Sequence, residues 1–368
     1  MLLVNRLFGF VAAAALFASA CMPGGGVPQA AGPTAPAKGL TGQARCDANK
    51  RAGKILFLTG FGYFPSVSVL DVITAREKGY FAEMCLEVDI QPSLPGESMV
   101  LVSANTVQFA ANSFGSITRG VVQGAQVKAV LNYGNLPIHV LIVQAESPVQ
   151  KLADLKGKTI GTTGGTVSAP NQAMLRTAGL IVERDYKQIA IGFDSRLITQ
   201  PGVDAIEGFR SNQPDLLERA GIKHRMFYPE DVGVISSFGS IIGSKEFLDK
   251  NPSASEDFVR AVKRGWEYAL ANTDEAIGFS QKLTRGDFDL PHEQFRWKTE
   301  SELAVKSTPA GQPQGRVIKD VVAREVAALV QVGLVTQIPD VNGLFDNSFF
   351  DAVHDSNGKL IWPGPIKQ

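Results

Sequence analysis

The chain has 368 residues, of which 44% are hydrophobic and 20% are charged, as is ordinary for a soluble globular protein. Lysine plus arginine equals aspartate plus glutamate at 36 each, so we expect no nucleic-acid partner. The length exceeds what one domain usually holds, which predicts more than one hydrophobic core.

The first 21 residues have the pattern of an export signal. Arg6 precedes an apolar run over 7–16, which is too short to cross a bilayer, since that takes roughly 20 apolar residues. Three small residues and then Cys21 resemble a bacterial lipobox, in which the cysteine is acylated and becomes the mature N-terminus. We therefore expect lipidation at Cys21 and a lipid-anchored protein on the periplasmic or extracellular face of the cell membrane. Ala18 departs from the usual leucine, so secretion with cleavage nearby and an uncleaved anchor are the alternatives.

Residues 22–52 are rich in glycine, proline, alanine and glutamine and hold few large apolar side chains. Such a stretch buries too little surface to offset its ordering entropy. It is therefore predicted to be a flexible tether.

Two further cysteines, Cys46 and Cys85, follow the one in the export signal. An even pair in an oxidising compartment predicts a disulfide between the end of the tether and the start of the second strand. Two separate buried thiols are the alternative, and mass spectrometry of the non-reduced protein would decide between them. Neither cysteine lies in a CxxC motif or near a histidine, which argues against metal binding or redox chemistry.

From residue 54 onward, strands and helices alternate with short connections. Strands are predicted over 54–58, 86–90, 107–110, 127–131 and 139–144, and helices over 66–79, 99–104 and 113–123. This alternation favours an α/β protein with mainly parallel sheets and flanking helices.

The same pattern restarts after residue 145. Strands are predicted over 159–161, 188–191, 203–206 and 235–243, and helices after the turn at 164–166 and over 195–199, 214–220, 253–271, 273–283, 291–300, 316–332 and 347–353. Two α/β units followed by a helical C-terminal return indicate a two-lobed clamp whose second lobe is an insertion. We expect lobe one over 53–145 and 245–368, lobe two over 146–244, and hinges near 144–147 and 243–245.

Six short motifs stand in order along the chain: AREKGYF at 75–81, LEVDI at 86–90, LADLKGKTIG at 152–161, VDA at 203–205, FRSNQP at 209–214 and FVRAVKRGWEY at 258–268. No single motif is specific. Together they resemble the ABC-transporter solute-binding proteins that take nitrate, sulfonates, taurine or thiamine-pyrimidine precursors. The resemblance covers roughly 54–276 and implies the two-lobed periplasmic-binding-protein fold of type II.

In such a fold the ligand lies between the lobes, where strands end and helices begin. Free N–H groups and helix dipoles favour acceptor or anionic groups there. In lobe one, Phe61 and Tyr63 are expected to stack on a planar ligand, with packing of the lobe as the alternative. Asn112 and Ser113 follow a strand and begin a helix, so they are expected to contact the ligand, with plain N-capping as the alternative.

Lobe two is expected to supply the opposite wall of the site. A turn there permits close backbone approach and offers a hydroxyl, with a simple turn as the alternative; its residues are Gly164, Gly165 and Thr166. The resemblance adds contacts by Asp204, Phe209 and Asn212. The histidines are scattered without metal-like spacing, so we expect no metal ligands, no catalytic residues and no cofactor.

Ligand identity is less determined than the site. The thiamine-precursor binders of the resembled family carry a glutamate where this chain has Gln213, and a neutral amide lacks the charge-assisted hydrogen bond to an aminopyrimidine. Arg196 and Arg210 are candidates for holding a sulfonate, taurine or nitrate instead, with an exposed surface arginine as the alternative for each. The aromatic loop at 61–64 favours a planar, heterocyclic ligand.

The resemblance implies a monomeric protein that captures a small nutrient and delivers it to an ABC permease and its ATPase, without being an enzyme. A pyrimidine-synthase-like enzyme and a ligand-sensing lipoprotein are the alternatives. A neighbouring permease and ATPase gene pair would favour transport, whereas substrate turnover by the purified protein would favour the enzyme.

Overall fold

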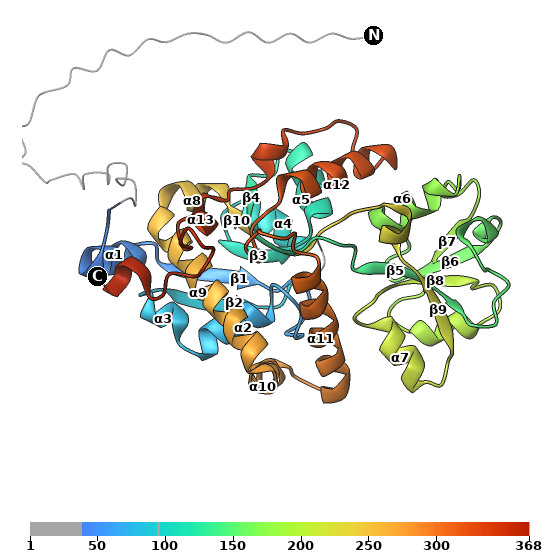
Figure 1. Cartoon of the computed structure of the whole chain (residues 1–368), viewed down its shortest axis with the longest axis horizontal. Coiled ribbons are helices and arrows are strands. Elements are labelled where there is room, and N and C mark those ends of the chain that lie inside the picture. Colours follow the sequence, from blue (N-terminus) through green and yellow to red (C-terminus); the bar gives the residue numbers. More distant parts are fainter. Residues whose placement is uncertain (1–38, 94–95, 368) are drawn as a thin grey trace, which may run out of the picture. The chain divides into compact units, whose positions relative to one another are not determined.

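The computed structural model describes residues 39–93 and 96–367, and the strands in this part of the chain form two five-stranded sheets (Figure 1). The strands of the first sheet are Lys54–Leu58 (β1), Glu87–Gln91 (β2), Phe109–Asn112 (β3), Val127–Gly134 (β4) and Phe238–Ser244 (β10). Their order is β2-β1-β3-β10-β4. Strand β1 pairs parallel with β2 and β3, whereas β10 runs antiparallel to β3 and β4.

The second sheet repeats this layout. Its strands are His139–Gln144 (β5), Thr159–Thr162 (β6), Lys187–Ala190 (β7), Ala205–Phe209 (β8) and His224–Phe227 (β9). Their order is β7-β6-β8-β5-β9, and β5 is the strand that runs against its neighbours. One reversed strand in each sheet leaves the others in a common direction, so the expected α/β fold with mainly parallel sheets is confirmed.

Strands β1 and β5 are buried on both faces, and alternate residues of a strand point to opposite sides. In β1, Ile55 and Phe57 enter one apolar cluster, whereas Leu58 enters another. In β5, Leu141 and Val143 face one cluster, and Val140 and Ile142 face the other. Strands buried on both faces are near-continuous apolar runs, which is why these two were predictable from sequence.

Helices supply the other side of these cores. They span Leu70–Glu77 (α2), Tyr80–Glu83 (α3), Glu97–Ser103 (α4), Phe114–Val122 (α5), Ala169–Thr177 (α6), Gln213–Arg219 (α7), Lys245–Lys250 (α8), Pro252–Ala271 (α9), Thr273–Leu283 (α10), Leu290–Lys306 (α11), Lys319–Gln331 (α12) and Ser348–Asp351 (α13). The long helix α9 packs closely on α2: a side chain at Gly265 would collide with the carbonyl oxygen of Asp71. None of the helices in the described residues is long and apolar enough to span a membrane.

Strand β5 belongs to the second sheet, whereas the predicted lobe boundaries placed it in lobe one. The chain leaves the first sheet after β4, and β5 pairs with β8 and β9 in the second sheet. The predicted boundary at 145 therefore assigned β5 to the wrong sheet. The hinges predicted near 144–147 and 243–245 fall at the ends of β5 and β10, whereas the chain crosses between the sheets over 135–138 and 228–237.

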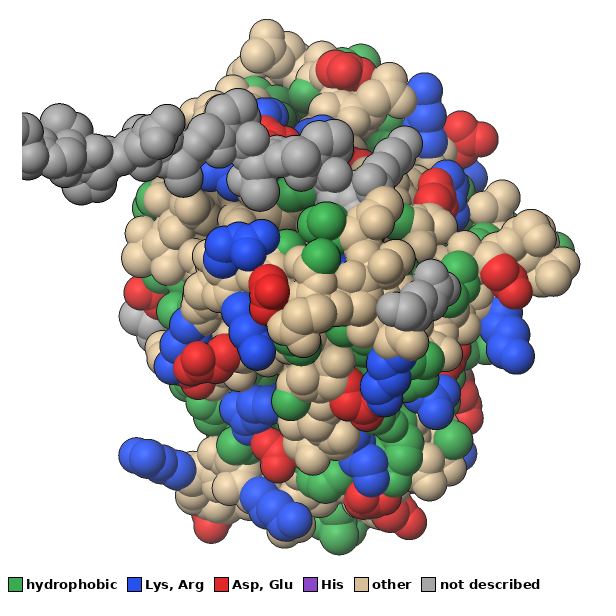
Figure 2. Space-filling model, turned by 90° about the vertical axis from the view of Figure 1, so that its left-hand side faces the viewer, with side chains coloured by type: hydrophobic (Ala, Val, Ile, Leu, Met, Phe, Trp, Pro, Cys, Tyr) green, Lys and Arg blue, Asp and Glu red, His purple; other side chains and the backbone are tan. Residues whose placement is uncertain are grey.

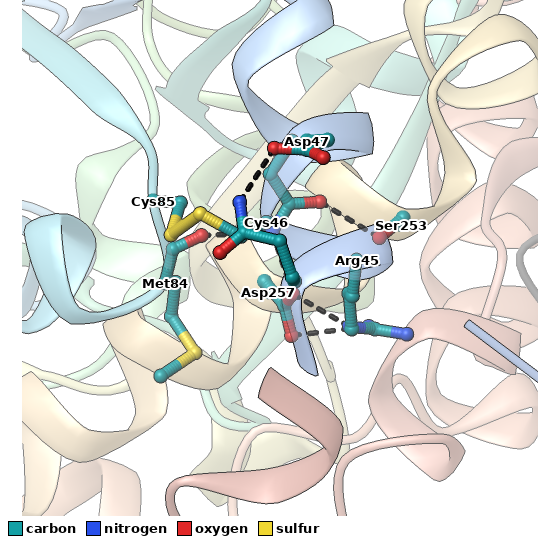
Figure 3. Close-up of a disulfide and its surroundings, with 9 residues drawn as sticks. Arg45, Cys46, Asp47, Met84, Cys85, Ser253 and Asp257 are labelled. Carbon is teal, nitrogen blue, oxygen red and sulfur yellow. Dashed lines mark hydrogen bonds and ion pairs between the residues drawn. A yellow bond between two sulfur atoms is a disulfide. The ribbon is translucent and has the colours of Figure 1, made fainter. Parts of the chain in front are cut away.

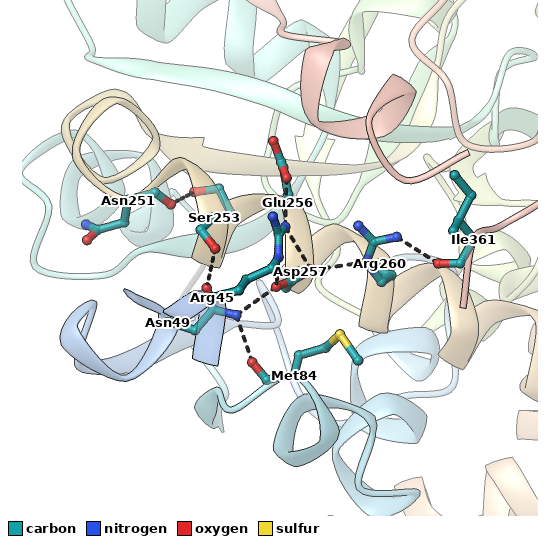
Figure 4. Close-up of polar contacts among 10 residues, drawn as sticks. Arg45, Asn49, Met84, Asn251, Ser253, Glu256, Asp257, Arg260 and Ile361 are labelled. Carbon is teal, nitrogen blue, oxygen red and sulfur yellow. Dashed lines mark hydrogen bonds and ion pairs between the residues drawn. The ribbon is translucent and has the colours of Figure 1, made fainter. Parts of the chain in front are cut away.

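The described end of the predicted tether is a helix, α1 (Gly42–Arg51), so the tether prediction is wrong for this segment. The helix is polar, and its sequence gives no sign of an apolar face. It is attached by ionic contacts instead: Arg45 is 2% exposed and pairs with Asp257 at 2.8 Å and Glu256 at 2.7 Å. Asn49 donates to the carbonyl oxygen of Met84 at 2.8 Å and to Asp257 at 2.7 Å (Figure 4). The predicted signal, Cys21 and the tether up to residue 38 lie outside the described residues.

The predicted disulfide between Cys46 and Cys85 is confirmed (Figure 3). It joins α1 to the turn before β2 and closes a loop with a sequence separation of 39 residues. On the chain-entropy model, closing a loop of that length stabilises the fold by roughly 3–4 kcal/mol. The covalent bond and the buried ion pairs thus hold α1 at the same place.

The surface near α1 carries charges of both signs. Figure 2 shows basic and acidic side chains interspersed over the face on the left of Figure 1. Mixed charges cancel at a distance, so this face offers no extended field of one sign.

We predict that Asp257→Ala lowers the free energy of unfolding by about 3–5 kcal/mol, because it leaves buried guanidinium groups without their carboxylate. Asp257 is 0% exposed and also accepts from Arg260 at 3.0 Å. Urea denaturation under non-reducing conditions measures the effect. The matched control is Glu256→Ala, whose side chain is 19% exposed and should contribute less than about 1 kcal/mol. Equal losses in the two variants would contradict the prediction.

Candidate functional site

The turn after β1 contains the aromatic residues predicted to stack on a ligand. Phe61 is 52% exposed, so its ring is available. Tyr63 is half-buried against the core, and its hydroxyl donates to the carbonyl oxygen of Ile90 at 3.2 Å. Burial raises the pKa of Tyr63, as expected for a phenol in an apolar setting. The structure therefore leaves Phe61 free for stacking, whereas Tyr63 packs the first sheet.

Asn112 and Ser113 end β3 and begin α5, as predicted. Ser113 is the N-cap, and its hydroxyl accepts from the amide of Ser116 at 3.4 Å. Asn112 accepts from the amide of Ser113 at 2.9 Å and donates to the hydroxyl of Ser98 at 3.3 Å. These contacts match the capping alternative, and a role in ligand contact stays a prediction.

A glutamate that the sequence did not reveal lies at the same end of α5. Glu325 of α12 accepts from the amide of Ser237 at 2.9 Å and from its hydroxyl at 2.6 Å. Burial raises the pKa of Glu325 to about 7, although the bonds from Ser237, the amide of Gly115 and the charge of Arg119 oppose this. Since Gly115 and Arg119 belong to α5, the carboxylate lies against the start of that helix.

The glycine turn of the second sheet follows β6 and leads into α6. Gly165 has φ +81°, a left-handed conformation that glycine adopts without strain. No atom lies within 4 Å of where a side chain on Gly164 would begin, and Thr166 is exposed. The backbone is therefore accessible at this turn, and its contact with a ligand stays a prediction.

A second glutamate lies at the start of α6. Glu207 of β8 accepts from the amide of Ser168, the N-cap residue, at 2.8 Å. The same oxygen accepts from the side-chain amide of Asn171 at 2.8 Å. Burial raises the pKa of Glu207, and these donors oppose the rise by favouring its charged form. The sequence analysis did not identify this residue.

Asp204 is not brought together with the other predicted residues. It precedes β8, whereas Phe209 ends that strand, so the two lie at opposite edges of the sheet. Its carboxylate accepts from the amide of Thr159 at 2.9 Å and pairs with Lys158 at 3.1 Å. These contacts join the starts of β6 and β8, which is a structural role.

Phe209 is the last residue of β8, and Asn212 lies in the turn that follows. The ring of Phe209 packs on His139 with 4.6 Å between centroids. Its amide donates to Gln213 at 2.7 Å. Gln213 is only 3% exposed, so this amide, found where binders of thiamine precursors carry a glutamate, stabilises its own turn. The side-chain oxygen of Asn212 lies 2.8 Å from Nε2 of His292 and accepts from Arg296 at 3.1 Å, both residues of α11.

Helix α11 brings the turns of the two sheets together. Glu300 accepts from the amide of Val67, beyond the β1 turn, at 2.9 Å, and from the hydroxyl of Ser211 in the β8 turn at 2.8 Å. The guanidinium of Arg296, which donates to Asn212, also lies 5.2 Å from the centre of the Phe64 ring. The aromatic turn of the first sheet and the predicted second wall are therefore linked through one helix, as a site between two lobes requires.

The two arginines that were candidates for an anionic ligand are both ion-paired. Arg196 pairs with Asp194 at 2.8 Å, and Arg210 pairs with Glu230 at 2.9 Å. Within residues 39–93 and 96–367, no group of three or more His, Cys, Asp or Glu side chains is arranged to hold a metal ion.

Solved structures with the same architecture identify the class of fold. The periplasmic aliphatic sulphonate binding protein SsuA from Escherichia coli matches with a TM-score of 0.58 and 16% identity, over 80% of this chain and 91% of that chain. The periplasmic nitrate-binding protein NrtA from Synechocystis PCC 6803 matches with a TM-score of 0.56 and 14% identity, over 81% and 86%. The protein thus has the periplasmic-binding-protein fold, as expected.

The family is established by sequence. The family described as NMT1/THI5 like matches residues 67–276, more than half of the chain, and the protein belongs to it. The chain is 29% identical over 257 residues to the riboflavin-binding protein RibY of Chloroflexus aurantiacus, covering 67% of this chain and 71% of the relative. It is 27% identical to the formylaminopyrimidine-binding protein of Halalkalibacterium halodurans, covering 58% and 66%.

The same comparison corrects one expectation. We expected a protein that is not an enzyme, but relatives include the 4-amino-5-hydroxymethyl-2-methylpyrimidine phosphate synthase THI5 of Saccharomyces cerevisiae. That synthase is 25% identical over 66% of this chain and 75% of its own length. Membership of the family therefore does not exclude catalysis. The expectation rested on the resemblance to solute-binding proteins and on histidines scattered without metal-like spacing, which are not sufficient to separate the two kinds of relative.

We predict that Glu325→Gln removes part of the pH dependence of stability. The pKa of Glu325 is about 7 in the fold against an ordinary 4.5, so its contribution to stability is present below pH 4.5 and lost as the pH rises through about 7. Between pH 5 and pH 8 the wild type should lose about 2–3 kcal/mol more than the variant in urea denaturation. Glu218→Gln, at an exposed position of α7, is the control and should follow the wild type. Parallel curves for wild type and Glu325→Gln would refute the prediction.

Proposed function

We propose that the protein is an extracytoplasmic solute-binding lipoprotein, anchored through Cys21, that captures a small planar nitrogen heterocycle. In this proposal two lobes, one built on each sheet, close on the ligand. The closed, monomeric form then delivers the ligand to an ABC permease and its ATPase. The fold shared with periplasmic binding proteins supports the role, and the export pattern of the first 21 residues supports the location.

The exposed ring of Phe61 is the observation that carries the ligand class. A half-exposed phenylalanine in a turn that is linked through α11 to the turns of the other sheet offers a flat apolar surface at the junction. Aromatic rings stack on planar ligands in offset or edge-to-face arrangements. Two relatives support the class, because riboflavin and formylaminopyrimidine are both planar heterocycles.

A sulfonate, taurine or nitrate is the alternative ligand class. This alternative is supported by two structural neighbours that are named as sulphonate- and nitrate-binding proteins. They are 16% and 14% identical to this chain, a level that shows a shared fold alone. The heterocycle is therefore the proposal that we carry forward.

We predict that the purified full chain is stabilised by one member of a panel of riboflavin, formylaminopyrimidine and 4-amino-5-hydroxymethyl-2-methylpyrimidine in thermal-shift measurements, since a ligand that binds only the native state raises Tm. Phe61→Ala should weaken binding of that compound by about tenfold or more, because it removes the stacking surface. Phe61→Tyr should retain affinity, whereas Phe61→Leu, which keeps apolar area but no ring, should not. An unchanged affinity in Phe61→Ala would remove this residue from the site.

The role itself needs two further measurements. Stimulation of ATP hydrolysis by a reconstituted ABC permease and its ATPase, on addition of the loaded protein, would support delivery. Mass spectrometry of the compound after incubation with the protein tests turnover, which some relatives carry out. Release of the compound unchanged is expected for a carrier.

A further inference from the structure

We propose that Glu207 and Glu325 occupy the two helix N-termini at the site and thereby select against anionic ligands. The inference rests on the proposed function and deepens it by naming the charge class of the ligand. The ligand would be a neutral or cationic compound that presents N–H or O–H donors, not a sulfonate or nitrate.

Both helices begin where a ligand of an open α/β sheet is expected. Helix α5 follows the carboxyl end of β3, and α6 follows the carboxyl end of β6 after the glycine turn. Ligands bind outside the carboxyl ends of such strands. The first amides of a helix have no partner within the helix and, with its dipole, form a natural anion site. An anion would therefore be expected at either helix start.

At the start of α6 two donors are already used by Glu207. The backbone amide of Ser168 and the side-chain amide of Asn171 donate to its carboxylate, at 2.8 Å each. The amide of Val167 donates to the side chain of Gln188 at 3.0 Å. Pro170, in the first turn, has no N–H group. The protein's own carboxylate thus has the position that an anionic ligand would take.

The start of α5 has the same arrangement, although the carboxylate comes from a distant part of the chain. Ser113 accepts the amide of Ser116, and Glu325 lies against the amide of Gly115 while it accepts both donors of Ser237. Glu325 is 6% exposed. Helix α12, which carries it, packs against both α5 and α6.

A second anion at either position would be repelled wherever the carboxylate is ionised, because like charges repel strongly where water is excluded. A carboxylate instead accepts hydrogen bonds from amine, amide or hydroxyl groups. Two of the cations that could compensate an anion, Arg196 and Arg210, are paired with Asp194 and Glu230. Charge at the site therefore favours ligands that donate hydrogen bonds.

The experiment uses the purified full chain with nitrate and ethanesulfonate as probes, measured by thermal shift and calorimetry. Wild type should show no stabilisation by either probe. Glu207→Ala frees the Ser168 amide and the Asn171 side chain. It should therefore melt lower than wild type and bind nitrate at least tenfold more tightly. Glu207→Gln removes the charge without leaving a gap. It should gain ethanesulfonate or nitrate binding to a smaller extent. If the alanine variant does not fold, Glu207→Gln provides the test in its place.

Glu218→Ala is the matched control, an exposed glutamate of the second sheet's α7, and it should respond to neither probe. Stabilisation of wild type by nitrate or ethanesulfonate would overturn the inference. So would Glu207 variants that bind the probes no better than wild type. The proposed ligand class is tested separately, by measuring whether the wild type binds any compound of the heterocycle panel. If the wild type binds no compound of the panel while Glu207→Ala gains nitrate binding, only the proposal of a heterocyclic ligand is refuted.

Discussion

The buried carboxylate of Glu300 is the contact on which the arrangement of the site depends. One of its oxygens accepts from the backbone of Val67 and the other from the hydroxyl of Ser211, so turns of both sheets meet at one side chain. Burial raises the pKa of Glu300, and the two donors act in the opposite sense. A buried acceptor that loses its donor carries a large desolvation penalty. Separation of the two turns would therefore be coupled to entry of water at Glu300.

Further contacts between α11 and the second half of the fold are also polar. His292 lies 2.6 Å from the carboxylate of Asp215 and 2.8 Å from the oxygen of Asn212. Hydrogen bonds exchange for water with a small net change, about 0.5–1.5 kcal/mol between neutral groups and about 1.5–3 kcal/mol to a charged group. A junction built from such contacts can open at lower free energy than one of interlocked apolar side chains, which suits hinged closure around a ligand.

Much of the fold was predictable from sequence, for identifiable physical reasons. Strands β1 and β5 were predicted to the residue because both of their faces are buried and their sequences are unbroken apolar runs. Strand β9 was missed because all of its residues are half-buried and include His224 and Arg225. Helix α1 was mistaken for tether because a disulfide and the ion pairs of Arg45 attach it, not an apolar face.

The site was only partly predictable, because some of its residues are placed by local sequence and others by contacts with distant parts of the chain. Residues that directly follow strands, such as Phe61 and Ser113, can be placed from local pattern alone. Asp204 lies apart from the other predicted residues because the motif that contains it begins a strand instead of ending one. The glutamates Glu300 and Glu325 lie in C-terminal helices whose sequences indicate only helicity, and their partners are far away along the chain. Such contacts become visible only when the tertiary structure is known.

The family contains both binding proteins and synthases, so the charge of the ligand and the fate of the ligand are separate questions. Both kinds of protein must first select a ligand, and selection depends on the groups that are fixed around it. Glu207, Glu300 and Glu325 each accept from a main-chain amide, which fixes them in position. Catalysis would in addition require groups whose interactions strengthen in the transition state. The carboxylates therefore bear on which compound enters the site, whichever of the two roles follows.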